Sequence, residues 1–300
     1  MATTSTALTR TPAASRSRRP RGALAQAARV FAHDRQAMLG LVIIAIIGGA
    51  ALAAPLISPW DPLTSASVDR LSPIGTPGHL LGTDEQGRDI LSRLIWGGRA
   101  SLLVGILPTV TAGVVALGLG LLAGYLGGLV DHVIMRALDV FFAFPLVLLA
   151  IAIVGVIGPG MGNQMFALAV VLVPYSTRVV RTAALSVKPL EYVEAARALG
   201  ASGGRLVGRH LLPNVLPPLL VYTSTLVGLM IVASAGLSFL GLGVQPPTPD
   251  WGVMVGNGRL VLYRAAHVAT IPGIVIVVAA LAFNFVGDGL REALDPRARR

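Results

Sequence analysis

The chain lacks cysteine and has few charged residues. Zero cysteine excludes disulfides, thiol nucleophiles and thiolate metal sites. Charged residues make up 13% of the 300 positions and hydrophobic residues 54%, whereas about a quarter of an ordinary soluble domain is charged. This composition excludes a soluble globular protein and indicates a membrane protein.

Lysine is almost absent as well, since Lys188 is the only one in the chain. The phosphate-binding loop G-x-x-x-x-G-K-[ST] requires a lysine directly after a glycine, and Lys188 follows Val187. The chain therefore has no nucleotide loop of this kind. We expect it to bind no cofactor itself, and any ATP-driven step would need an ATPase on another polypeptide.

Long apolar runs dominate what is present. A helix needs roughly 20 residues to cross the hydrocarbon core, and we expect an all-α polytopic membrane protein with six such helices. The apolar run Met38–Ile57 exceeds the 7–15 residues usual for a signal-peptide core, so we interpret it as the first span. The expected spans are 38–58, 100–126, 133–157, 165–182, 215–243 and 268–290.

These spans predict a simple organisation of the chain. The expected segments are a basic cytoplasmic tail at 1–37, a first span with an external loop at 38–99, a five-helix core at 100–290 and a cytoplasmic C-terminal tail at 291–300.

The net charge of +10 is distributed unevenly across the predicted topology. With the N-terminus inside, 18 of the 24 Lys and Arg residues fall in inside segments and 6 in outside segments. This bias follows the positive-inside rule and predicts cytoplasmic termini. The arginine-rich tail also has the composition of a nucleic-acid contact, but we interpret it as a topology determinant near anionic lipid headgroups and expect no nucleic-acid partner.

Small and polar residues in the predicted spans suggest how the helices pack. Gly120, Gly124 and Gly128 are four residues apart, a spacing typical of close helix packing. Arg136 and Asp139 are expected to pair near the cytoplasmic boundary.

No ionisable residue falls at the middle of a predicted span, and Asn284 is the strongly polar side chain clearly inside one. Ion-coupled carriers place ionisable groups along their pathway, so this pattern disfavours such a carrier.

The external loop after the first span carries a possible helix start. Thr83 and Gln86 resemble a capping box, and apolar residues over 90–95 then share one helical face. We expect a short helix at the membrane surface there, with Trp96 in the headgroup zone, although an ordinary loop helix fits equally.

Two catalytic or cofactor motifs match by letter only. Gly118, Gly120 and Ala123 satisfy G-x-G-x-x-G/A, but that fingerprint must follow a strand in a soluble βαβ unit. Residues 200–204 satisfy G-x-S-x-G, but a nucleophile elbow must also follow a strand. Both lie among predicted helices, so we expect neither dinucleotide binding nor hydrolysis.

The segment Glu191–Asn214 is a charged island between apolar spans. Glu191 and Glu194 lie in the first turn of a predicted short helix and Arg197 in its last turn, as the helix dipole favours. Gly200 stands where a C-terminal cap needs positive φ.

A second short helix is expected after Ser202, which can cap it, until Pro213 ends the regular pattern. Val193, Ala196 and Leu199 are expected on one side of the first helix. A slim charged helix pair can fit a groove on a soluble partner. The alternative is a solvated loop that only orients two spans.

The island resembles the "EAA" loop of membrane subunits of ABC importers. The matching residues are Glu194, Ala195 and Ala196, then Gly200 four positions on, then Leu212 and Pro213. Further stretches are similar to signatures of the dipeptide/oligopeptide permease C-type subunit, and the resemblance covers about residues 35–297. These stretches are 81–105, 236–255 and 285–297.

The resemblance implies a type I ABC importer permease fold and a site that contacts an ATPase. In that family the EAA loop forms coupling helices that dock on the cytoplasmic ATPase. His210 departs from the family pattern, which usually has an apolar residue there, and we interpret it as a tolerated surface or packing change. The implied ATPase-coupling residues are Glu194, Ala195, Ala196, Gly200, Ala201, Arg205, Leu212 and Pro213.

The resemblance also implies partners and an activity. The partners are a homologous permease subunit, two ABC ATPases that use ATP and Mg, and an extracytoplasmic solute-binding protein. The expected function is that of a non-catalytic permease subunit for peptides in the inner membrane of a prokaryote. Import of nickel chelates or glutathione-like compounds, an ion-coupled carrier and a membrane scaffold without transport are the alternatives.

Overall fold

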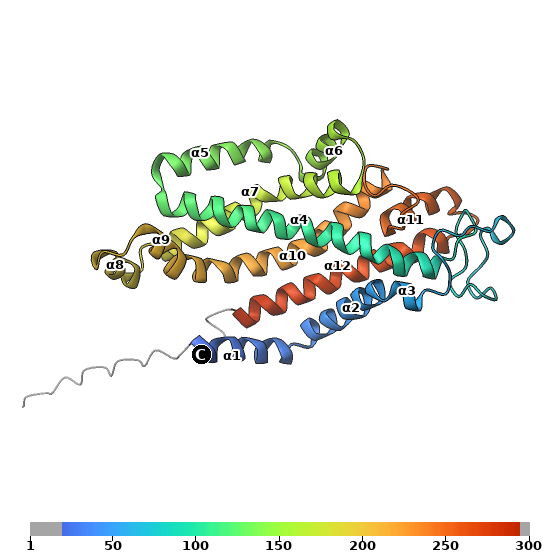
Figure 1. Cartoon of the computed structure of the whole chain (residues 1–300), viewed down its shortest axis with the longest axis horizontal. Coiled ribbons are helices and arrows are strands. Elements are labelled where there is room, and N and C mark those ends of the chain that lie inside the picture. Colours follow the sequence, from blue (N-terminus) through green and yellow to red (C-terminus); the bar gives the residue numbers. More distant parts are fainter. Residues whose placement is uncertain (1–19, 295–300) are drawn as a thin grey trace, which may run out of the picture.

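The computed structural model describes residues 20–294, with side chains described from residue 25 onward apart from Ser67. Residues 1–19 of the predicted basic tail and residues 295–300 of the predicted C-terminal tail lie outside the described residues. Within 20–294 the chain is helical, with two isolated β-bridges and no longer strand. The helices are α1 Pro20–His33, α2 Arg35–Leu52, α3 Ala54–Ile57, α4 Ile90–Leu126, α5 Gly128–Asp139, α6 Leu146–Ile157, α7 Met161–Val187, α8 Glu191–Ala198, α9 Gly203–Leu206, α10 Leu212–Phe239, α11 Trp251–Gly258 and α12 His267–Leu294 (Figure 1).

Five of the described helical segments are long and apolar enough to cross a membrane, and a bent pair of helices makes a sixth. These five confirm the predicted spans 1, 2, 4, 5 and 6 in position, and most of them extend further than predicted. The segment that contains α10 begins at Gly203, and α4 begins at Ile90. The five are Arg35–Leu52, Ile90–Leu126, Met161–Val187, Gly203–Phe239 and His267–Leu294.

The third predicted span, 133–157, is wrong as a single helix. Residues Gly128–Ala143 and Leu146–Ile157 meet at an angle of 90°. The cause is Pro145, because a proline ring disfavours helical backbone in the residue before it. Phe144 is accordingly extended, with φ −117° and ψ 137°.

Small residues bring α4 and α7 into close contact. A Cβ added to Gly120 would lie 2.5 Å from Val180 Cβ, and one added to Gly124 would lie 2.7 Å from Ala184 Cβ. The predicted close packing is therefore confirmed at these two positions. Gly128 has open space around it and a φ of +53°, because the chain turns there into α5.

The expected capping box and surface helix in the external loop are wrong. Thr83 is buried, and its hydroxyl donates to the Asp69 carbonyl and accepts from the Ser72 N–H. The helix instead begins at Ile90, where the Asp89 carboxylate accepts from the Ser92 N–H at 2.7 Å. This helix is α4, so residues 90–95 form the first turns of a spanning helix and no separate surface helix.

A buried polar anchor joins α11 to α4. The Ser101 hydroxyl donates to Asp250 Oδ2 at 2.8 Å and accepts from the Trp251 N–H at 3.0 Å. The Trp251 indole N–H donates to the Leu94 carbonyl at 2.9 Å. Burial raises the pKa of the Asp250 carboxyl, while the hydrogen bonds from Val253 and Ser101 oppose that shift.

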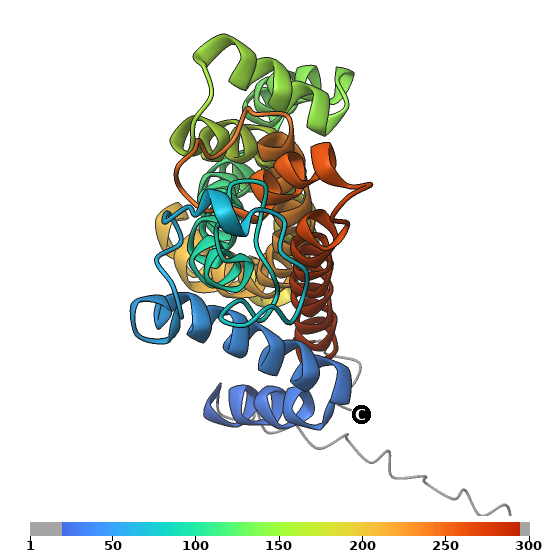
Figure 2. The same cartoon turned by 90° about the vertical axis from the view of Figure 1, so that its right-hand side faces the viewer.

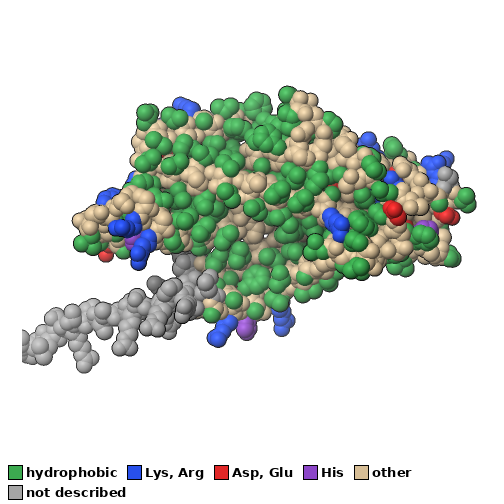
Figure 3. All heavy atoms as spheres, in the orientation of Figure 1, with side chains coloured by type: hydrophobic (Ala, Val, Ile, Leu, Met, Phe, Trp, Pro, Cys, Tyr) green, Lys and Arg blue, Asp and Glu red, His purple; other side chains and the backbone are tan. Residues whose placement is uncertain are grey.

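The elements sort towards two ends of the molecule. The α8–α9 pair lies at one end of the molecule, together with the start of α1 and the end of α12 (Figure 1). The segment 58–89 lies at the other end. Figure 2 shows α5 and α6 at one edge of the bundle and α1 and α2 at the opposite edge. Hydrophobic side chains cover the middle of the face in Figure 3, and most charged ones lie nearer its ends.

The contact between α4 and α7 predicts a position-specific effect on stability. Gly120→Ala should lower the free energy of unfolding by about 1–3 kcal/mol, because the added methyl group overpacks the contact with Val180. Gly118→Ala is the matched control, since nothing lies within 4 Å of a Cβ added there. Thermal unfolding in detergent measures both variants, and equal melting temperatures would contradict the packing assigned to Gly120.

Candidate functional site

The site residues expected from the sequence lie in the segment between α7 and α10. This α8–α9 segment (residues 191–213) projects past the turn between α4 and α5 at one end of the bundle (Figure 1). It consists of α8, a tight turn around Gly200, α9 and a π-helical turn Val207–Leu211 that leads into α10.

The charges and the end of α8 follow the expected helix signals. Glu191 and Glu194 lie in the first turn and Arg197 lies near the last. Gly200 has a φ of +81°, and its N–H donates to the Arg197 carbonyl at 2.9 Å. The Ala201 N–H donates to the Ala196 carbonyl at 3.1 Å. These two bonds form a Schellman motif, so the predicted positive φ of Gly200 is confirmed.

The second predicted helix differs from its expected form at both ends. Ser202 occupies the N-cap position of α9 but makes no side-chain cap hydrogen bond. Pro213 does not end the helix, because it lies in the first turn of α10. The preceding π-helical turn explains this tolerance, since the Leu212 N–H bonds to the Val207 carbonyl five residues back. A wider turn makes room for a proline ring that would clash inside a regular α-helix.

One side of the α8–α9 segment is buried against the spans. Val193, Leu206 and Leu211 are almost completely buried. They belong to an apolar cluster with residues of α4, α7 and α10. A Cβ added to Gly203 would lie 2.8 Å from the Tyr125 hydroxyl, so the start of α9 lies directly against α4. The other buried members are Leu121, Val180, Ala184, Val187, Val215 and Leu219.

Lys188 links the start of this segment to α4. Its Nζ donates to the Tyr125 carbonyl at 2.7 Å and lies 3.5 Å from the Gly124 carbonyl. These carbonyls lack helical partners at the end of α4, where a cation is favoured. Sequence reasoning missed this contact, because the predicted span ended at residue 182, six residues before Lys188, whereas α7 ends directly before it.

The opposite side of α8 is exposed. Glu194 and Ala195 are exposed, Tyr192 is 45% exposed and Leu199 is 89% exposed. The expected apolar face of Val193, Ala196 and Leu199 is therefore wrong for Leu199. Six residues turn a helix by roughly 600°, so Leu199 lies about 240° around the axis from Val193.

The structure divides the eight predicted coupling residues into two groups. Five are exposed and three are half-buried against the apolar cluster. The exposed residues are Glu194, Ala195, Gly200, Arg205 and Pro213, and the half-buried ones are Ala196, Ala201 and Leu212.

His210 packs beside α8. Its ring centroid lies 5.9 Å from that of Tyr192, and its carbonyl accepts from the Asn214 side chain at 2.6 Å. Asn214 also donates to the Tyr192 hydroxyl at 3.2 Å. His210 thus has a packing partner on α8.

The two motifs that matched by letter lie in helical surroundings. Gly118, Gly120 and Ala123 are inside α4, and residues 200–204 run from the Schellman turn into α9. Neither motif follows a strand, which both chemistries require. Across residues 20–294, no group of three or more His, Cys, Asp and Glu side chains is arranged to hold a metal ion.

Comparison with known sequences gives consistent matches. Residues 116–300 match the family described as "Binding-protein-dependent transport system inner membrane component". Residues 23–73 match the "N-terminal TM domain of oligopeptide transport permease C". The chain is 43% identical to a di/tripeptide transport system permease protein of Pseudomonas aeruginosa over 274 residues, covering 90% of each chain. It is 41% identical to a glutathione transport system permease protein of Pectobacterium atrosepticum over 271 residues, again covering 90% of each.

Solved structures show a similar fold. A chain of the MetNI methionine ABC transporter, in inward facing conformations, matches with a TM-score of 0.55 and 20% identity, over 69% of this chain and 98% of that one. A chain of an amino acid ABC transporter crystallised with histidines matches with a TM-score of 0.50 and 18% identity, over 65% and 90%. These likenesses concern the fold alone.

The Schellman turn predicts a local effect of substitution at Gly200. A left-handed backbone costs a non-glycine residue roughly 1–2 kcal/mol, so Gly200→Ala should raise amide exchange across 191–200 by about 5- to 30-fold. Gly204→Ala is the control, because Gly204 has neither a positive φ nor a neighbour within 4 Å of an added Cβ. Hydrogen exchange read by mass spectrometry compares the two, and unchanged exchange in Gly200→Ala would refute the assignment.

Proposed function

The chain belongs to the binding-protein-dependent transport system inner membrane component family, and we propose that it is one permease subunit of an ATP-driven importer of small peptides. The relatives named for di/tripeptide, dipeptide and glutathione transport support this substrate class. Dipeptides, tripeptides and glutathione share amide bonds and charged amine and carboxylate groups. The chain is a multi-pass protein of the prokaryotic cytoplasmic membrane.

The α8–α9 segment is the proposed contact with the ATPase. Its exposed side combines Glu194 with small Ala195 and the turn at Gly200, while Leu199 stands almost fully exposed. A slim helix with charged and apolar groups suits a groove on a soluble partner. The excess of arginine in the predicted inside segments supports a cytoplasmic position for this end.

The anchoring of α8 is the observation that carries the coupling proposal. Val193 on α8 is completely buried in the same apolar cluster as Val180 of α7 and Val215 of α10. Packed interiors transmit displacement because they have few voids to absorb it. A movement of the ATPases that shifts α8 would therefore shift α7 and α10 together. The shift of these spans would change the side of the membrane to which the transport path is open.

This division of labour leaves covalent chemistry to other subunits. ATP and Mg²⁺ would be bound by two separate ATPases, since Lys188 is committed to α4 carbonyls in this chain. A homologous permease subunit would complete the path. A solute-binding protein would deliver peptide at the opposite end, where the segment 58–89 lies (Figure 1).

Disrupting the exposed side of α8 should uncouple transport from ATP hydrolysis. Glu194→Lys combined with Gly200→Pro reverses one charge and removes the positive φ of +81°, which proline cannot adopt. We expect ATP-dependent uptake of Ala-Ala by proteoliposomes containing the whole complex to fall at least tenfold, which corresponds to the loss of roughly 1.4 kcal/mol of coupling.

Glu292→Lys is the matched control, because it makes the same charge change at an exposed position of α12. It should retain uptake within about twofold, as surface substitutions outside a contact usually do. Normal uptake by the double variant would refute the coupling role of α8. Uptake by the wild-type complex without ATP would instead favour an ion-coupled carrier.

A further inference from the structure

The break between α5 and α6 lies beside the middle of a spanning helix. The Phe142 ring centroid lies 4.6 Å from that of Tyr175. The helix α7 has 27 residues, so Tyr175 lies within about 2 Å of its middle at 1.5 Å per residue. Non-helical backbone at membrane depth is tolerated only where protein covers it or where it lines a water-filled cavity. Phe144 at the break is nevertheless 54% exposed.

An ion pair sits at the same place. Arg178 Nη2 donates to Asp139 Oδ1 at 2.5 Å, and the guanidinium lies 3.7 Å from the Phe142 ring centroid. The Arg178 and Asp139 side chains are 47% and 45% exposed. Arg178 lies about 6 Å from the middle of α7. Charged groups at this depth rarely face lipid and usually face a water-filled path or a protein partner.

This pair corrects one expectation from the sequence. Asp139 was expected to pair with Arg136, but it bonds to Arg178 on the neighbouring helix. The expectation that no ionisable residue falls at the middle of a span stays a prediction, since Arg178 is four residues from the middle of α7.

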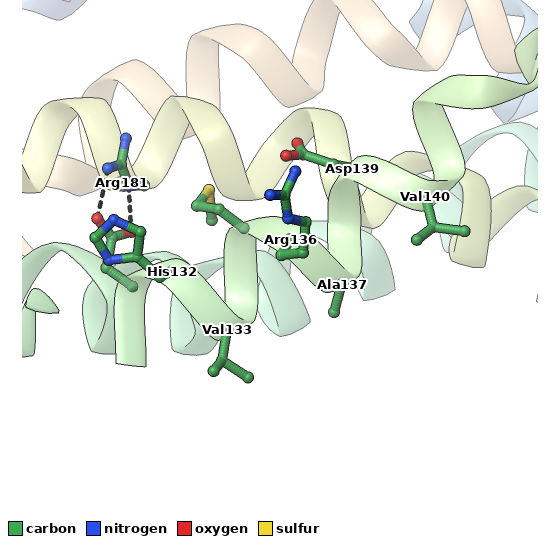
Figure 4. A pocket seen from close by; sticks show the side chains of 9 residues that line it. His132, Val133, Arg136, Ala137, Asp139, Val140 and Arg181 are labelled. Atoms are coloured by element: carbon green, nitrogen blue, oxygen red, sulfur yellow. Dashed lines mark hydrogen bonds and ion pairs between the residues drawn. The ribbon is translucent and has the colours of Figure 1, made fainter. Parts of the chain in front are cut away.

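A pocket of about 730 Å³ is lined by Asp139 of this pair, by other residues of α5 and by Arg181 of α7. Figure 4 shows Arg136 and Asp139 extending toward each other, while Val133, Ala137 and Val140 point away. Arg181 closes the other end of the pocket by bonding to Asp131. Arg136 has no ion-pair partner within the described residues. Two arginines, Arg136 and Arg181, and two aspartates, Asp131 and Asp139, thus line the space.

We propose that the α5–α6 break and the Arg178–Asp139 pair line the path of the transported solute, and that Arg178 receives the carboxylate of a passing peptide. This inference rests on the proposed function. A guanidinium matches a carboxylate with two parallel N–H donors. Asp139 already pairs with Arg178, and each of the two side chains is nearly half exposed. A peptide carboxylate can therefore displace Asp139 from Arg178, and Asp139 can later displace the peptide in turn. Such exchange suits transport, in which a solute must bind weakly enough to leave.

The absence of cysteine in the natural chain allows a direct test of the path. Ala143→Cys places a thiol at the exposed end of the break, and Ala45→Cys makes the same change at an exposed position of α2. Exposed neighbours of Ala45 are the apolar Leu41, Val42 and Ile46. An anionic, membrane-impermeant methanethiosulfonate reacts with the thiolate, which forms in water. In the whole complex in vesicles, Ala143→Cys should be modified about ten times faster than Ala45→Cys.

Ala-Ala at saturating concentration with the binding protein and ATP should slow this modification. Mass spectrometry of this chain reads the extent of reaction, so cysteines on other subunits do not interfere. Equal rates at the two positions, or no effect of Ala-Ala, would overturn the proposed path.

Charge variants distinguish two roles of Arg178: a contact with the transported peptide, and an ion pair that only holds α5 against α7. Arg178→Met should lower the uptake of Ala-Ala about tenfold through loss of a charge-assisted hydrogen bond, while Arg178→Lys should retain more of it. Asp139→Asn breaks the same ion pair but leaves Arg178 available, so it should lower uptake less than Arg178→Met does. Equal losses in Arg178→Met and Asp139→Asn would show that the pair only holds α5 against α7, and would overturn the contact with substrate.

The outcomes also distinguish this inference from the proposed function. ATP-dependent uptake of Ala-Ala by the wild-type complex, together with an unreactive Ala143→Cys, would refute the path and leave the proposed function standing. A wild-type complex that imports no peptide would refute the proposed function, and the relative reactivity of Ala143→Cys and Ala45→Cys would still decide whether the break faces water.

Discussion

The structure depends on the need to satisfy backbone hydrogen bonds where water is absent. In hydrocarbon, each free N–H or C=O costs several kcal/mol, so a chain can cross only as a helix or a closed barrel. The described residues obey this rule with long helices such as α4, α7 and α12. The places where the helices stop are therefore the informative ones. At Gly200 the chain turns back toward the bundle, and at Phe144 it breaks between α5 and α6.

Apolar packing then ties these irregular places to the rest of the bundle. The close approach of α4 and α7 at Gly120 aligns the two helices that carry Lys188 and its carbonyl partners. The buried side of α8 joins the same helices, so the exposed side is presented on a rigid base. An ATPase that moved this base and a solute that crossed beside Arg178 would act on one helix, α7.

Sequence reasoning succeeded where a single local force decides the structure. Hydropathy located five spans, and the spacing of Gly200 after α8 indicated a positive φ that glycine adopts without strain. It failed at Phe144, because long hydrophobic runs mask the effect of one proline. It also missed the bonds of Arg178 and Lys188, whose partners are 39 and 63 residues away. Partners this distant depend on helix packing that local patterns do not encode. The predicted apolar side of α8 was wrong for one residue, because Leu199 lies on the exposed side and Val193 on the buried side.

The π-helical turn Val207–Leu211 sets the azimuth of α8. One additional residue in a turn advances every residue beyond it by about 100° around the helix axis. Removing one residue there would restore a regular helix and swing the preceding segment by about that angle relative to α10. The direction in which Glu194 faces is therefore governed by the number of residues in a turn that Glu194 does not touch. A single-residue insertion or deletion in that turn would therefore act as a rotation of α8.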